Sequence, residues 1–176
     1  MFQAAMSVAF FGFLRVGEFT STPRNPIPLI RGDIKLVEHA TLTINIRRSK
    51  ADQWGKGALI SIGCSRDKCC PVRAMNRYLK SACLPDSAPL FQFRYGSPLT
   101  AKTFRALLRY HLHKIGLNSR KYNTHSFRIG AATAAAKAGF SESKIMHLGR
   151  WRSKAFQAYV QFTPSHTTAA AEMARV

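Results

Sequence analysis

The side chains able to do chemistry fall into three short clusters that lie far apart in the sequence. In chain order the clusters hold Arg15 and Glu18, then His125 and Arg128, then Arg150, Trp151 and Tyr159. A guanidinium stays charged at any working pH and matches two phosphate oxygens at once. A phenol becomes a nucleophile where nearby cations favour its deprotonated form. Together these groups suit the cutting and rejoining of a phosphodiester without a metal ion.

The chain is strongly basic along its whole length. It has 27 Lys and Arg against eight Asp and Glu, a formal net charge of +19 over 176 residues. Such an excess repels itself in a compact fold unless the usual partner is a polyanion, and nucleic acid is the commonest one. The basic residues are spread out, so we expect a positive surface on the folded body. Charge alone leaves a secreted cationic protein or a ribosome-like binder as alternatives.

The cysteines and the apolar residues at the start of the sequence indicate in which cellular compartment the protein is expected. Cys64, Cys69, Cys70 and Cys83 are too few and too unevenly spaced for a disulfide framework, and no histidine lies at zinc-finger spacing from them. We expect structural thiols in a reducing compartment, with no metal and no cofactor. Residues 1–14 are apolar, but they lack the basic start of a signal peptide and are too short to span a bilayer. The protein is expected to be neither secreted nor membrane-bound: nuclear in a eukaryote, otherwise cytoplasmic or in the nucleoid.

The hydrophobic pattern predicts a mainly helical domain with one small sheet. A helix that is apolar nearly all round is expected over 2–19, and strands at 33–37, 41–46 and 57–62 form an antiparallel sheet with a basic hairpin at 47–56. The remaining helices are expected at 71–83, 100–115, 125–138, 141–148 and 154–162, with Thr100 and Thr124 as caps, Ser141 at a helix start, and Gly116 and Gly139 as stops. The fold class is therefore α+β, in one domain over 1–176.

Taken alone, each cluster has an ordinary structural explanation. Tyr159 suits the core face of an amphipathic helix, and a His-x-x-Arg pair such as His125 and Arg128 is usually a surface pair. Their spacing nevertheless projects both side chains from one face at a helix start, where the helix dipole attracts phosphate. Arg15 and Glu18 are three apart and suit a helix-face ion pair. A charge that close to a buried segment needs a partner, so Glu18 can also orient the guanidinium.

Read together and in order, the clusters resemble the tyrosine recombinase (phage-integrase-like) family. The first box of that family is matched by FGFLRVGE at 11–18, and the second by HSFR at 125–128, an alanine-rich helix, LGRW at 148–151 and Tyr159. The phrases FFGFLRVGE at 10–18 and SKADQWGKG at 49–57 are most similar to recombinases of eukaryotic mobile elements of the DIRS and Crypton type. The resemblance covers essentially the whole chain and implies the catalytic-domain fold of that family.

The resemblance also implies a role for each residue of the clusters. Tyr159 attacks the scissile phosphate and forms a 3′-phosphotyrosyl bond with release of a 5′-hydroxyl. Arg15 and Arg128 clamp the phosphate, and His125 assists proton transfer. Because the covalent bond stores the energy of the broken one, neither ATP nor a metal is needed.

Two positions stay open within the family pattern. A lysine on the sheet hairpin protonates the departing oxygen; Lys50 is preferred, and Lys56 is the alternative. Many family members carry histidine directly after the glycine of the LGRW segment, whereas this chain has Arg150 there and Trp151 next to it. We assign the phosphate contact to the Trp151 indole N–H, with the ring beneath the tyrosine helix, and expect Arg150 and His147 to form a solvated or DNA-facing pair.

The expected partner is double-stranded DNA. Candidates for phosphate contacts, which position but do not specify, are Arg47, Arg48, Arg105, Arg109, Arg120, Lys121 and Arg152. The resemblance implies a separate amino-terminal DNA-clamping domain, which we expect to be missing from this sequence. It also implies self-association on DNA as a synaptic tetramer, with residues 163–176 docking on a neighbouring subunit.

Three functions remain open at this stage. The first is a catalytic DNA recombinase or integrase domain. The second is a non-catalytic DNA-binding remnant of a mobile element that keeps the motifs. The third is a type IB topoisomerase, which uses the same constellation but is disfavoured by the short chain and the integrase-like boxes.

Overall fold

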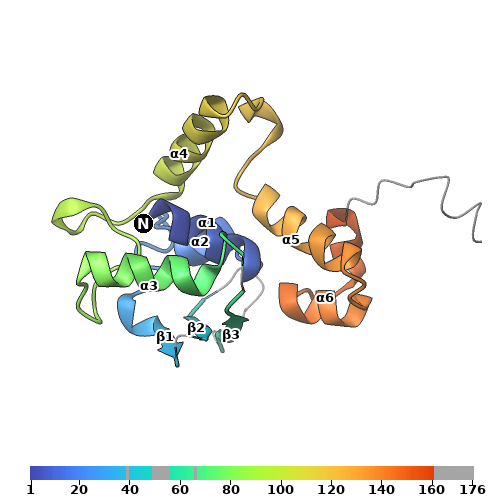
Figure 1. Cartoon of the computed structure of the whole chain (residues 1–176), viewed down its shortest axis with the longest axis horizontal. Coiled ribbons are helices and arrows are strands. Elements are labelled where there is room, and N and C mark those ends of the chain that lie inside the picture. The colour runs from blue at the N-terminus through green and yellow to red at the C-terminus, as the bar shows by residue number, and fades with distance from the viewer. Residues whose placement is uncertain (39, 49–55, 66, 161–176) are drawn as a thin grey trace, which may run out of the picture.

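The computed structural model describes residues 1–38, 40–48, 56–65 and 67–160, and it confirms the predicted α+β class (Figure 1). The helices are α1 (Phe2–Phe11), α2 (Val16–Phe19), α3 (Pro71–Ala82), α4 (Ala101–Lys114), α5 (Ser126–Lys137) and α6 (Glu142–Gly149). The strands are β1 (Ile34–Val37), β2 (Thr41–Ile46) and β3 (Ala58–Gly63). Short 3₁₀ helices lie at η1 (Arg31–Asp33), η2 (Arg94–Gly96), η3 (Ser119–Lys121) and η4 (Lys154–Tyr159). Within the described residues no helix is both long enough and apolar enough to cross a bilayer.

The sheet is a three-stranded antiparallel meander in the order β1-β2-β3. Alternation along β2 fixes its register, because Leu42, Ile44 and Ile46 are buried while the residues between them are not. Leu42 lies opposite Ile62, and Ile44 lies opposite Ile60. Helices α1 and α3 pack over one face (Figure 1), so the sheet presents its other face and the β3 edge outward.

Two hydrophobic clusters make up the core, one on each side of the carboxyl end of α1. The larger joins α1, the sheet, α3 and the first half of α4, with Phe104 at its centre. The smaller joins α5, α6 and η4 around Ala132, Ile145 and Phe156. Phe13, just after α1, is buried in the smaller cluster and ties the two halves of the domain together.

Four helices end in the same hydrogen-bonded turn, in which one residue adopts a left-handed conformation. Gly116 and Gly139 fill that position after α4 and α5, and both were predicted as helix stops. After α1 the position is held by Phe13 (φ 51°), and after α6 by Arg150 (φ 54°). The helix predicted over 2–19 is therefore wrong: α1 stops at Phe11, and α2 is a separate turn. Since Phe does not signal such a turn, periodicity alone carried that prediction through Phe13, whereas the helix expected over 141–148 ends within one residue of the end of α6.

Two further expectations need correction, and two are confirmed. The Thr100 and Ser141 hydroxyls accept backbone N–H groups and cap α4 and α6, as expected. The α5 cap is His125 and not Thr124, because a turn at 123–125 delays the helix by one residue. The helix expected over 154–162 is a 3₁₀ turn at Lys154–Tyr159.

Phe104 should be the most sensitive single position in the larger cluster. It is fully buried, and its ring lies 5.2 Å from that of Phe2 and 5.1 Å from that of Phe19. Phe104→Ala should lower the free energy of unfolding by about 3–5 kcal/mol, since transfer and cavity terms add. Denaturant titration by circular dichroism measures this. Tyr95→Ala, at a fully exposed ring, is the control and should shift it by less than about 0.5 kcal/mol. Similar losses in both variants would contradict the assigned core.

Candidate active site

A buried carboxylate holds two arginines from distant segments. Glu18 is 2% exposed, and its Oε1 accepts from Arg15 Nη1 at 3.1 Å while its Oε2 accepts from Arg150 Nη2 at 2.8 Å. The backbone N–H of Arg15 also donates to Oε2, at 2.8 Å. Breaking a buried ion pair is expensive, so the three groups constrain one another strongly. The predicted Arg15–Glu18 pair is confirmed. The solvated alternative for Arg150 is wrong, since its side chain is 17% exposed, whereas the DNA-facing alternative for Arg150 and His147 stays a prediction.

Arg150 is embedded because α1 ends beneath it. Its Nη1 donates to the Gly12 carbonyl at 3.1 Å and its Nη2 to the Phe13 carbonyl at 3.3 Å. These carbonyls belong to the turn that ends α1, where the helix dipole favours a cation. Burial lowers the pKa of Arg150, the Glu18 carboxylate opposes that effect, and the guanidinium stays charged.

Arg128 occupies a cage between the two left-handed turns. It is 1% exposed, and its guanidinium donates to the carbonyls of Phe13 and Gly149, which lie at the ends of α1 and α6. The Trp151 ring covers it, with the guanidinium carbon 4.2 Å from the ring centroid. Arg128 thus points inward from α5 and joins all three chemical clusters.

Gly149 is required by this stacking. A Cβ atom built on it would overlap the six-membered ring of Trp151, which lies directly against the glycine backbone. Trp151 also packs edge-on against Phe13, with centroids 6.1 Å apart, and against Phe156 of η4 at 6.2 Å. The expectation that Trp151 packs beneath the tyrosine-bearing turn is confirmed, since η4 contains both Phe156 and Tyr159.

His125 lies close enough to Arg128 and Arg15 to be affected by their charges. It caps α5, and its own backbone N–H donates to Asn123 Oδ1 at 2.7 Å. Partial burial lowers the pKa of His125 below 6.5, and the positive charges of Arg128 and Arg15 lower it further. Its imidazole is therefore neutral near pH 7 and able to take up a proton.

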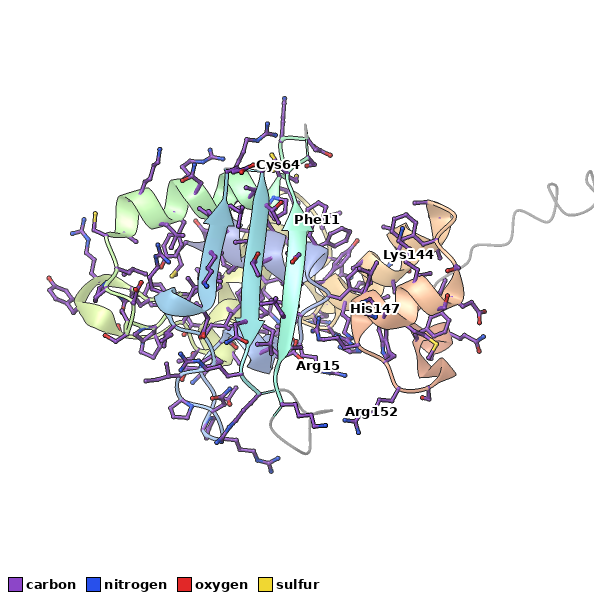
Figure 2. The ribbon with its side chains drawn as sticks, turned by 90° about the horizontal axis from the view of Figure 1, so that it is seen from below. Phe11, Arg15, Cys64, Lys144, His147 and Arg152 are labelled. Carbon is purple, nitrogen blue, oxygen red and sulfur yellow. The ribbon has the colours of Figure 1, made fainter. Side chains whose placement is uncertain are left out.

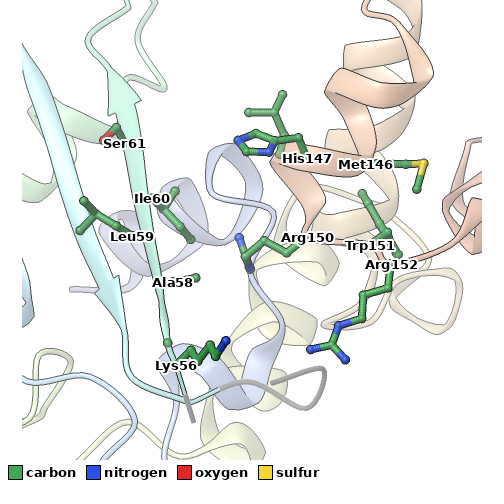
Figure 3. A pocket seen from close by; sticks show the side chains of 12 residues that line it. Lys56, Ala58, Leu59, Ile60, Ser61, Met146, His147, Arg150, Trp151 and Arg152 are labelled. Carbon is green, nitrogen blue, oxygen red and sulfur yellow. The ribbon is translucent and has the colours of Figure 1, made fainter. Parts of the chain in front are cut away.

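A pocket of about 700 Å³ separates β3 from the segment at 146–152 (Figure 3). Lys56 and Ser61 line the sheet side, while His147, Arg150 and Arg152 line the opposite side. Figure 2 shows Arg15, His147 and Arg152 between the sheet and the carboxyl-terminal helices. The concentration of cationic groups around an open cavity favours an anion.

The structure describes the side chain of only one of the two predicted lysines and does not describe that of the predicted tyrosine. Lys56 lines the pocket, whereas Lys50 is outside the described residues. Tyr159 is the last residue of η4, and its side chain is outside what the structure describes. The backbone of η4 is placed by contacts of that turn with α5 and α6.

The candidate phosphate contacts divide among several parts of the molecule. Arg47 follows β2, and its Nε donates to the buried Asp33 at 2.9 Å, so this side chain helps to fix the start of the sheet. Arg47 nevertheless remains exposed. The other candidates are exposed as well: Arg48 after β2, Arg105 and Arg109 on α4, Arg120 and Lys121 on η3, and Arg152 at the pocket.

Sequence reasoning missed the contact between Arg150 and Glu18 and the need for Gly149. A signal for the first was present, because Arg150 fills the slot that carries histidine in many members of the resembled family. The contact between Arg150 and Glu18 depends on the left-handed turns at Phe13 and Arg150, and the local sequence does not predict their conformation.

Comparison with known proteins gives a result at the level of structure only, because no family profile and no curated protein matches the sequence. The crystal structure of XerA recombinase is similar, with a TM-score of 0.72 and 24% identity over 98% of this chain and 57% of that one. The XerH site-specific recombinase bound to palindromic difH substrate gives a TM-score of 0.73 with 17% identity, over 98% of this chain and 45% of that one. The Tn1549 transposon integrase in complex with circular intermediate DNA gives 0.63 with 16% identity, over 98% and 58%.

The fold is that of a tyrosine recombinase catalytic domain. The fold prediction is confirmed, and this chain spans about half the length of the recombinases it matches. Because the recombinase fold brings the sequence clusters together, it gives Arg15, His125, Arg128 and Arg150 a common location. Among the described residues, no three His, Cys, Asp or Glu side chains are grouped so as to hold a metal ion.

His125 should titrate below pH 6.5 in the folded protein, because burial and the two arginines disfavour its charged form. The folded chain then binds fewer protons than the unfolded chain just below pH 6.5, so acidification through that window lowers stability. Proton NMR of the imidazole across pH 4–8 measures the midpoint, and Arg15→Gln should raise it. A wild-type midpoint at or above 6.5 would contradict the assigned surroundings of His125.

Proposed function

We propose that this chain is the catalytic domain of a DNA breaking and rejoining enzyme of the site-specific recombinase type. The observation that carries the proposal is the convergence of Arg15, Arg128 and Arg150 around Glu18 and the end of α1. A merely structural ion pair needs one cation for one carboxylate. Three guanidinium groups with one carboxylate leave a positive surplus beside the pocket, which suits a phosphodiester.

Each arginine contributes differently to phosphate binding. Arg15 is about a quarter exposed and donates one Nη to Glu18, so we assign it and Arg150 to the non-bridging phosphate oxygens on the pocket side. Arg128 completes the clamp by exchanging the Gly149 carbonyl for a phosphate oxygen, since a hydrogen bond to an anion is stronger than one to a neutral carbonyl. Glu18 keeps Arg15 and Arg150 close together before DNA binds.

The chemical step that we propose conserves the number of phosphodiester bonds. The Tyr159 phenolic oxygen attacks phosphorus, a 3′-phosphotyrosyl bond forms, and the bond to the 5′ oxygen breaks. The neutral His125 accepts the phenolic proton, and a lysine at the pocket mouth gives a proton to the departing oxygen. The presence of Lys56 in the pocket lining supports it for that task, and Lys50, which the sequence prefers, is the alternative. The reverse attack by a 5′-hydroxyl restores the DNA.

The substrate in this proposal is double-stranded DNA. Exposed basic residues on α4, η3 and the pocket rim supply phosphate contacts that do not depend on base sequence. The recombinases of similar fold are about twice as long, so we propose that full activity uses a second DNA-binding region and a tetrameric assembly on DNA. Two sequence phrases favour a mobile element of the DIRS or Crypton type as the source.

A nicked suicide duplex tests the nucleophile. A pool of duplexes of random sequence, each nicked so that a short strand diffuses away after cleavage, should give a detergent-stable protein–DNA adduct. Tyr159→Phe should abolish the adduct because only the nucleophilic oxygen is lost. Lys80→Ala, which removes an exposed charge of α3 away from the pocket, should retain it.

Three results would overturn or redirect the proposal. An adduct that survives Tyr159→Phe would assign the nucleophile elsewhere. Salt-sensitive binding of duplex with no adduct would favour the non-catalytic remnant. Relaxation of supercoiled plasmid without strand exchange would favour the topoisomerase.

Two substitutions decide between Arg150 and Trp151 as the further phosphate donor. Trp151→Phe keeps an aromatic ring over Arg128 but removes the indole N–H, whereas Arg150→Ala removes a charge facing the pocket. We expect the initial rate of adduct formation to fall by about 10²–10³ in Arg150→Ala and by less than tenfold in Trp151→Phe. Urea unfolding of both variants separates a loss of chemistry from a loss of fold. The reverse ranking would assign the phosphate contact to Trp151.

A further inference from the structure

Two cysteines meet at a place that the proposed chemistry does not use. Cys64 follows β3 and Cys70 caps α3, and their Sγ atoms are 3.4 Å apart, in hydrogen-bond contact. Cys64 is exposed, whereas Cys70 is 1% exposed. The sequence spacing does not predict this pair, because the packing of α3 on the sheet brings the end of β3 and the start of α3 together.

The surroundings polarise the pair so that the negative charge lies on the buried sulfur, which can act as the base for the exposed one. Burial by itself raises the pKa of Cys70, but backbone N–H groups of Arg73 and Ser65, the Cys64 thiol and the N–H of Val72 lower it to about 7. The Ser65 N–H lies 3.4 Å from Cys70 Sγ. The pKa of Cys64 is raised, first by its hydrogen bond to Cys70. The pair therefore loses its first proton near neutral pH, and the resulting negative charge lies on Cys70.

We propose that Cys64 and Cys70 are a reversible dithiol–disulfide site whose oxidant is a low-molecular-weight disulfide of the glutathione type. The sulfur atoms need to approach from 3.4 Å to the bond length of about 2.0 Å, a movement that two side-chain rotations at element ends allow. The neighbouring Cys69 is exposed, and Cys83 lies at the far end of α3. Neither makes a sulfur–sulfur contact among the described residues, so the geometry selects one pair.

The reaction balances in two exchange steps. The exposed Cys64 sulfur attacks the small disulfide while its proton passes to Cys70, giving a mixed disulfide and one thiolate, which takes the proton back from Cys70. The Cys70 thiolate then attacks the Cys64 sulfur and expels the second thiolate. The two cysteines lose two electrons, and the small disulfide gains them as one thiol and one thiolate. The product bond ties the edge strand β3 to the first turn of α3.

Redox titration followed by peptide mapping tests this site. The whole chain is equilibrated in buffers of reduced and oxidised glutathione, acid-quenched, unfolded, alkylated with iodoacetamide and digested with trypsin. Cleavage after Lys68 separates the two cysteines, so the disulfide appears as a linked peptide pair. We expect this pair to replace both alkylated peptides under oxidising buffer, to revert with dithiothreitol, and to leave Cys83 alkylated.

Single substitutions give the controls. Cys69→Ser and Cys83→Ser should leave the linked pair unchanged. Cys70→Ser should instead accumulate a glutathione adduct on Cys64, and Cys64→Ser, at an exposed position, should leave Cys70 without a partner. The proposal is wrong if wild type stops at a persistent adduct, if Cys70 pairs with Cys69, or if both thiols stay alkylatable under oxidising buffer.

Discussion

The site depends on the buried carboxylate of Glu18. A carboxylate that is 2% exposed must be paired, and the groups that pair with it come from the turn after α1 and the turn after α6. Its two oxygens separate Arg15 from Arg150 and offset their repulsion. The two ion pairs of Glu18 therefore hold both guanidinium groups together at the end of α1. Loss of this carboxylate would leave three neighbouring cations without a counter-charge.

The same arrangement explains why α1 stops where it does. Because α1 ends at Phe11, the carbonyls of Gly12 and Phe13 lie beyond the helix, where they accept from Arg150 and Arg128. The left-handed conformation of Phe13 costs about 1–2 kcal/mol relative to glycine, which has no Cβ to clash. The buried contacts of its ring and the cations on its carbonyl offset that cost. The interruption of the helix is thus part of the site.

Local features of the sequence predicted the sheet, the α4 and α6 caps, the Gly116 and Gly139 stops and the Arg15–Glu18 pair, because each depends on neighbouring residues. The motifs also predicted which distant segments would meet. That prediction came from their resemblance to a known family, because no local physical rule brings segments so far apart in the sequence together. The end of α1 was missed because the residue type of Phe13 disfavours the left-handed conformation that it adopts there. The Arg150–Glu18 and Cys64–Cys70 contacts were missed because they form only when separate elements pack together.

In the proposed mechanism Arg15, Arg128 and Arg150 surround one phosphate opposite the Tyr159 oxygen. A crystal structure of the protein with cleaved duplex ends and orthovanadate, which mimics five-coordinate phosphorus, tests it most directly. We expect vanadium bonded to the Tyr159 oxygen, with its equatorial oxygens within hydrogen-bond distance of all three guanidinium groups and the Gly149 carbonyl released by Arg128. Vanadate bound elsewhere, or a Tyr159 oxygen remote from these arginines in the DNA complex, would contradict it.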